Sequence, residues 1–163
     1  MYTRRITLFS AITLVSVIIL AIVMNGRIDV EEIRSATVFY QDVEIAESAG
    51  YQRLELEECV ESSEGAKGYH YVNASLLDLS LEPDEPEMLI YAPDAVGNLT
   101  LVAVEYAVPI TAWDVYDSDP PSLFGKDFHV NMEQDLYVLH SWVWQDNPAG
   151  MFADYNPAVS CTS

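Results

Sequence analysis

The feature that most constrains the fold is an apolar stretch near the C-terminus, Tyr137–Trp144, with the sequence YVLHSWVW. β-branched and aromatic residues dominate this stretch, which predicts a β-strand. Period-two alternation places Val138, His140, Trp142 and Trp144 on one face, and Tyr137, Leu139, Ser141 and Val143 on the other. Because both faces are largely apolar, we expect this strand to be central in its sheet and covered on both sides.

The rest of the chain predicts an α+β fold. Apolar residues recur at helical spacing across 37–50, which indicates one amphipathic helix, and Gly50 suits the position just past its end. Strand signals follow at Leu54–Glu57, Tyr69–Asn73, Met88–Tyr91, Leu99–Val108 and, less regularly, Phe124–Val130. One helix followed by about five or six strands with hairpin-length connections favours a curled, barrel-like antiparallel sheet with the helix packed on one face.

The first 26 residues are predicted to anchor or target the chain. Arg4 and Arg5 precede an uncharged apolar run, Ile6–Met24, which would form a membrane helix about 28 Å long. An uncleaved signal anchor and a cleaved secretory signal both fit this run, and the flanking charges place the N-terminus in the cytoplasm. We therefore divide the chain into a signal anchor or signal peptide, 1–26, a linker, 27–36, and an extracytoplasmic domain, 37–163. The domain is tethered to the cell membrane, or secreted if the signal is cleaved.

The charge balance limits the possible partners. The chain has 26 acidic and 7 basic residues and a net charge of −19, and the first acidic residue is Asp29. Such a field repels nucleic acid and anionic lipid, so nucleic acid is not expected as a partner. It suits cations, basic partners, or a surface that stays hydrated in high salt, as in halophilic proteins. The acidic residues are spread rather than clustered, which favours the high-salt interpretation.

Two cysteines and two sequons suit an extracytoplasmic domain. Cys59 and Cys161 both follow the apolar run, and in that compartment an even pair most simply forms a disulfide. Two free thiols or two thiolate ligands are the alternative. Asn73 and Asn98 each begin a short glycosylation sequon, a pattern that also occurs often by chance.

One constellation could carry chemistry. Glu105 is the only acidic residue within the apolar strand Leu99–Val108, and alternation places it on the face of Leu99, Leu101, Ala103 and Ala107, which should be buried. A buried carboxylate must be paired, protonated or bound to a cation. His70 and His140 come from two other predicted strands and could meet Glu105 inside a curled sheet. Two histidines and one carboxylate suit a zinc, iron or copper ion. Five aromatic residues would form the pocket around it: Tyr69, Tyr71, Tyr106, Trp142 and Trp144.

A structural interpretation of the same residues stays open. Glu105 could simply bond a buried histidine or a tyrosine hydroxyl without any metal. His129 lies in a less regular segment and is predicted to be a surface histidine. Ser141 lacks the turn of a nucleophile, so no catalytic residue is assigned. Two functions remain: a binding or structural module whose aromatic residues bind a small ligand or pack as core, and a metalloprotein or metalloenzyme with a two-histidine, one-carboxylate site.

Several short motifs stand out along the chain: GYHYVN at 68–73, VEY at 104–106, LHSWVW at 139–144 followed by NPAGMF at 147–152, and NPAVSC at 156–161. Together they resemble a family of secreted or membrane-anchored hypothetical proteins. The resemblance extends from residue 37 to the end of the chain. It implies an extracytoplasmic location and a shared region around His70, Glu105 and His140, but no reaction. The chain departs from the family in its acidic surface and at Ser141, where an apolar residue is expected.

Overall fold

The computed structural model describes residues 30–54 and 58–162. It confirms a mixed fold with an antiparallel sheet, few helices and one disulfide. The predicted anchor, 1–26, lies outside the described residues and stays a prediction. Among the residues that are described, no helix combines the length and the apolar character needed to cross a bilayer.

The main sheet is seven-stranded and antiparallel, and its strands follow the order β1-β3-β4-β5-β9-β8, with β2 paired to β3. Its strands are β1 Gln52–Arg53, β2 Val60–Ser62, β3 Gly65–Val72, β4 Met88–Pro93, β5 Leu99–Pro109, β8 His129–Asn131 and β9 Leu136–Ser141. A separate hairpin joins β6 Ser122–Leu123 to β7 Lys126–Asp127. The predicted barrel-like closure is wrong, because the end strands β1 and β8 are short and do not pair with one another.

The helical region begins earlier than predicted and is broken. It comprises α2 Val30–Thr37, the 3₁₀ turn η1 Val38–Gln41 and α3 Val43–Ser48, so it includes most of the predicted linker, 27–36. The break has a local cause: the Asp42 side chain accepts a hydrogen bond from the Glu44 backbone N–H and starts a new helix there. The single predicted helix over 37–50 is therefore wrong. A fourth helix, α4 Ile110–Tyr116, follows β5 directly.

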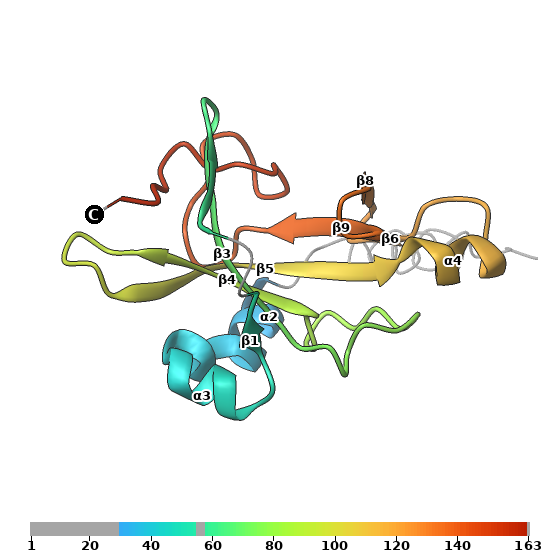
Figure 1. Ribbon diagram of the computed structural model, residues 1–163, viewed down its shortest axis with the longest axis horizontal. Helices are drawn as coiled ribbons and strands as arrows, with labels where there is room; N and C mark the ends of the chain where they lie inside the picture. Colours follow the sequence, from blue (N-terminus) through green and yellow to red (C-terminus); the bar gives the residue numbers. More distant parts are fainter. Residues whose placement is uncertain (1–29, 55–57, 163) are drawn as a thin grey trace, which may run out of the picture.

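The two faces of the sheet are covered by different parts of the chain. Figure 1 shows α2 and α3 on one side and the C-terminal segment, in orange and red, on the other. We call these the helix side and the tail side, where the tail is residues 142–162; within it, Val143 and Trp144 turn back and pack on the helix side. The helix-side core contains Ile33 and Ala46 from the helices together with Tyr91 and Tyr106 from the sheet. On the tail side, Trp142 and Val159 pack against Ile90 and Ala103.

A β-bulge decides which side chains of β5 share a face. Ile90 pairs with Ala103 and Tyr91 pairs with Leu101, so Val102 is an extra residue in the ladder. Strict alternation therefore fails at this point, and Leu101 packs on the helix side while Ala103 packs on the tail side. The predicted grouping of Glu105 with Leu99 and Leu101 is wrong for that reason, although its grouping with Ala103 and Ala107 holds.

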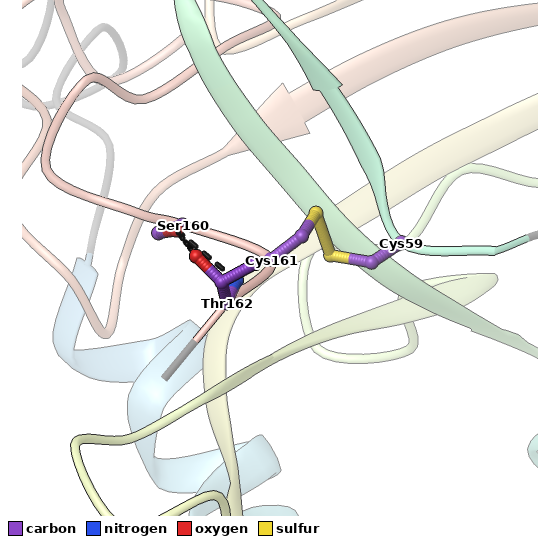
Figure 2. Close-up of a disulfide and its surroundings, with 4 residues drawn as sticks. All are labelled: Cys59, Ser160, Cys161 and Thr162. Carbon is purple, nitrogen blue, oxygen red and sulfur yellow. Dashed lines mark hydrogen bonds between the residues drawn. A yellow bond between two sulfur atoms is a disulfide. The ribbon is translucent and has the colours of Figure 1, made fainter.

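The tail is fastened to the sheet at several points. The predicted disulfide is present: Cys59 and Cys161 are bonded, with a Cα–Cα distance of 5.6 Å across 102 residues of sequence (Figure 2). Asn156 exchanges two backbone hydrogen bonds with Ala66, of 3.0 and 3.2 Å. A side chain at Gly65 would meet the Asn156 carbonyl at 2.3 Å, so this close approach of two backbones requires glycine. These contacts hold the tail across the tail side of the sheet.

Candidate metal centre

Three predicted residues meet on the tail side of the sheet. Glu105 lies on the central strand β5, directly opposite His140 on β9. His70 lies on β3, opposite Ile90 of β4, and its imidazole reaches across that strand to Glu105. Each of the three residues offers one ligand atom, and these atoms lie within 4.8 Å of one another. The structure therefore brings together His70, Glu105 and His140, which the sequence singled out.

The distances between the imidazole nitrogens and the Glu105 oxygens can be compared with those of hydrogen bonds and of metal ligands. His70 Nε2 lies 3.4 Å from Glu105 Oε2, and His140 Nε2 lies 3.4 Å from Glu105 Oε1. A charge-assisted hydrogen bond between such groups would be about 2.7 to 2.9 Å long. Ligand atoms around a tetrahedral zinc ion, each about 2.0 to 2.2 Å from the metal, are separated by about 3.3 to 3.6 Å. Both observed contacts are longer than such a hydrogen bond, and each imidazole faces a different oxygen of Glu105, an arrangement compatible with a common ion between the three side chains.

Burial keeps both imidazoles uncharged. His140 is 0% exposed, Glu105 3% and His70 7%. Burial, assisted by the charge of Lys67, lowers the pKa of His70 to about 4. Burial lowers the pKa of His140 well below its usual value, and His70, Lys67 and His129 lower it further. Only a neutral imidazole has a lone pair to bind a metal, so these pKa shifts favour a ligand role near neutral pH.

The imidazole of His140 is buried without a hydrogen bond. Among the described residues, neither its Nδ1 nor its Nε2 has a partner in hydrogen-bonding geometry. Nε2 faces Glu105, while Nδ1 lies 3.9 Å from Asp154 Oδ1 in the tail. Leaving a buried polar group unsatisfied costs about 1 to 3 kcal/mol, so this ring is held in place at the expense of stability.

A second group of candidate metal ligands lies beside the first and was not predicted from the sequence. His129 Nε2 lies 3.3 Å from Asp154 Oδ1, and together with His140 they form another set of ligand atoms within 4.8 Å of one another. His129 was predicted to be a surface histidine, and its side chain is 41% exposed, but it lies beside Asp154 rather than alone. It pairs with Val138 in the ladder, which places it on the same face as His140, two residues further along β9. No sequence signal indicated that the irregular tail would bring Asp154 there.

Two residues of the LHSWVWQDNPAGMF motif position Asp154. The indole N–H of Trp142 donates to the Ala153 carbonyl at 2.6 Å, and the Asn147 amide donates to the Tyr155 carbonyl at 3.0 Å. The backbone is thus held immediately before and immediately after Asp154. Rigid support of this kind is typical of residues whose side chain must be placed accurately.

A cleft gives access to both groups. It has a volume of about 290 Å³ and opens to solvent beside the histidines. Its lining includes His70, Glu105, His129 and Asp154 from the two donor groups, together with Lys67 and Tyr155. An ion or a small ligand can therefore reach the buried cluster from outside.

The predicted aromatic pocket does not form as a unit. Tyr71 and Tyr106 are buried in the helix-side core, and Tyr69 and Trp144 pack against it, whereas Trp142 lies on the tail side. Tyr69 and Tyr71 flank His70 in a strand and so point to the opposite face. Trp144 leaves the predicted face because β9 ends at Ser141 and the alternation ends with it. The cleft beside the histidines is lined by other residues.

The two sequon asparagines lie in different surroundings. Asn73 is buried, and its amide donates to the Ala49 carbonyl while its oxygen accepts from Ser75. Asn98 is exposed in the turn between β4 and β5, where it bonds Asp94. Of the two side chains, only that of Asn98 is accessible in the folded domain, and the glycosylation of either stays a prediction.

Comparison with known proteins finds no counterpart: no family model, curated protein or solved structure matches the chain. The resemblance of its motifs to secreted hypothetical proteins stays a prediction. The basis for inferring a function is therefore the placement of the side chains described above.

Proposed function

We propose that this chain is a metal-binding protein whose ion is held by His70, Glu105 and His140. The observation that carries the proposal is the convergence of one buried carboxylate and two buried imidazoles, whose ligand atoms lie within 4.8 Å of one another. The contacts of Glu105 with each imidazole, both 3.4 Å long, are longer than charge-assisted hydrogen bonds and suit metal ligands. A divalent cation would also neutralise a carboxylate that is otherwise costly to bury.

The donor types narrow the choice of metal. Two imidazoles and one carboxylate suit zinc, copper or iron, whereas calcium and magnesium prefer sites made only of oxygen atoms. Three protein ligands leave at least one position open for water or another ligand. Zinc is the first candidate because it commonly takes histidine and carboxylate ligands in a four-coordinate site with one position open.

Elemental analysis of the full-length protein, purified without a polyhistidine tag, tests the proposal. We expect stoichiometric zinc, copper or iron, either as isolated or after loading, and its loss in His140→Ala and Glu105→Gln. Glu87→Gln is the matched control, because Glu87 is an equally buried carboxylate outside the cluster. A normally folded wild-type protein that takes up no metal at any loading would falsify the proposal.

A catalytic metal centre is the second candidate, and one observation favours it. The cleft reaches His70 and Glu105 from solvent, so a substrate could approach an open coordination position. Cobalt-substituted protein tests this: azide should change the visible spectrum if the open position is accessible. An unchanged spectrum at saturating azide would leave a binding or structural role for the metal.

The location of the domain is part of the proposal. A disulfide that closes 102 residues suits an oxidising compartment, and the apolar N-terminal run suits export to one. We propose an extracytoplasmic domain, tethered by residues 1–26 or secreted, that belongs with the hypothetical proteins whose motifs it resembles. Cell fractionation and the N-terminal sequence of the mature protein would distinguish a tethered form from a secreted one.

A further inference from the structure

The imidazole ring of His140 lies between the two groups of candidate metal ligands. Its Nε2 faces Glu105 at 3.4 Å on one side, and its Nδ1 faces Asp154 at 3.9 Å on the other. Among the described residues, neither nitrogen is in hydrogen-bonding geometry, although the ring is fully buried. A buried imidazole normally satisfies at least its N–H with an acceptor. The two opposite nitrogens of this ring are both directed at potential metal ligands.

Each carboxylate facing the ring is accompanied by one further histidine. His70 completes the inner group at 3.4 Å from Glu105, and His129 completes the outer group at 3.3 Å from Asp154. The two groups have the same composition, one carboxylate and one imidazole apiece, and they share His140. They differ in exposure: the inner group is buried, whereas the side chains of His129 and Asp154 are about two-fifths exposed.

We infer that the imidazole of His140 bridges two metal ions, one held with His70 and Glu105 and the other with His129 and Asp154. The inference rests on the proposed function, because the inner ion is the one proposed above. The outer ion is bound by groups that are open to the cleft, so it exchanges more readily than the inner ion. A pair of transition metal ions bound to nitrogen and carboxylate ligands is the class of cofactor that this site takes.

The charges and bonds of this arrangement balance. A neutral His140 carries one N–H, and its proton passes to water as the second metal–nitrogen bond forms. Two divalent ions, two carboxylates and one imidazolate then leave a net charge of about +1, which a bound hydroxide or the acidic surface can compensate. With metal–nitrogen bonds of about 2.0 to 2.1 Å, ions on opposite nitrogens of one ring lie about 6 Å apart. The alternative is one inner ion with Asp154 accepting the His140 N–H from outside the coordination shell.

Metal stoichiometry separates these arrangements. Full-length metal-free protein is titrated with Zn²⁺ in excess Ca²⁺ and high salt, which occupy and screen the surface carboxylates. We expect two Zn²⁺ per chain in the wild-type protein and one in His129→Ala, with weakened outer binding in Asp154→Asn. Glu133→Gln is the control, because it removes another carboxylate from the lining of the same cleft and should still bind two ions.

The outcomes distinguish the inference from the proposed function. One ion in both the wild-type protein and His129→Ala overturns the bridge and leaves the inner site intact. Two ions in His129→Ala also overturn it, because the second ion then lies elsewhere. No ion in the folded wild-type protein overturns both proposals together.

Copper provides a readout that depends on the bridge itself. Two Cu²⁺ ions joined by one imidazolate are exchange-coupled, so the electron paramagnetic resonance signal that grows with the first equivalent should fall with the second. His129→Ala should keep the full signal of one uncoupled Cu²⁺. A wild-type signal that doubles with the second equivalent would place the two ions on separate, unbridged ligands and would overturn the inference.

Discussion

Buried polar side chains are hydrogen-bonded differently on the two faces of the sheet. On the helix side, three buried tyrosines each donate a hydrogen bond to a backbone carbonyl: Tyr51 to Pro86 at 2.7 Å, Tyr91 to Tyr40 at 2.5 Å and Tyr106 to Pro83 at 2.7 Å. On the tail side, His140 has no such bond within the described part of the chain, and it faces Glu105 at a separation too long for a strong one. The helix side is therefore organised for stability, and the tail side keeps groups that weaken the metal-free fold.

Two buried carboxylates make the contrast sharper. Glu87 and Glu105 are 2% and 3% exposed. Glu87 accepts a backbone N–H from Ala107 at 3.0 Å, and burial, assisted by the charges of Asp78 and Glu85, raises its pKa to about 8. Glu87 can therefore avoid a buried negative charge by taking up a proton. Glu105 faces two neutral imidazoles, and we propose that a bound cation neutralises its charge.

The largest expected effect comes from releasing the tail. Cys59→Ser combined with Cys161→Ser should lower the free energy of unfolding by about 4 to 5 kcal/mol, because the disulfide closes a loop of 102 residues. Denaturant unfolding measures this loss. Amide exchange should accelerate most in the tail and in β2, which the disulfide holds together. Ser160→Ala, which leaves the disulfide in place, is the control. A loss below about 1 kcal/mol, or equal acceleration on both faces, would contradict a tail held mainly by this bond.

The next effect concerns Glu87 and depends on pH. Its folded-state pKa of about 8 exceeds the ordinary carboxyl value of 4.5, so the folded protein binds one proton more than the unfolded chain between these values. Stability from this group is complete below pH 4.5 and is lost as the pH rises towards 8, by about 5 kcal/mol at most. Glu87→Gln should therefore raise the unfolding free energy at pH 8.5 but not at pH 4.5. Glu64→Gln, at an exposed carboxylate, is the control, and equal stabilisation at both pH values would refute the assignment.

A metal ion should stabilise the folded protein through the tail-side cluster alone. At a free concentration one hundred times Kd, Zn²⁺ should add about 2.7 kcal/mol to the unfolding free energy. For a chain of this size that corresponds to a rise in Tm of about 5 to 10 °C, measurable by differential scanning fluorimetry. Glu105→Gln should abolish the rise, whereas Glu87→Gln should keep it. An equal rise in both variants would mean that zinc acts through the acidic surface rather than through the cluster.

Local alternation was enough to predict part of the site. Glu105 stood out as a charge within an apolar strand, and its side chain does point to the same face as those of His70 and His140. The open sheet with its short end strands was not predictable from such patterns, because closure depends on strand lengths and pairing at both edges. The bulge at Val102 also escaped, since one extra residue changes the face of everything before it without any sequence mark.

The missed residues share a different cause. His129 belongs to a three-residue strand, and Asp154 belongs to a tail without regular structure, so neither has a periodicity that reveals its direction. Trp142 and Asn147, which hold the backbone around Asp154, were visible as motif residues, but their hydrogen bonds are tertiary. Trp144 was assigned to the wrong face because the strand was expected to continue three residues too far. Long-range placement of loops is the step that sequence patterns do not encode.

The smallest expected effect tests the helix side. Tyr106→Phe removes the hydrogen bond from the buried hydroxyl to the Pro83 carbonyl while keeping the ring in the core, and should cost about 1 kcal/mol of unfolding free energy. Zinc affinity should be unchanged, because Tyr106 points away from His70, Glu105 and His140. Tyr116→Phe, at a tyrosine that is 74% exposed, is the matched control and should cost nothing measurable. If Tyr106→Phe weakened zinc binding as much as Glu105→Gln does, the two faces would be coupled and the division between stability and binding would not hold.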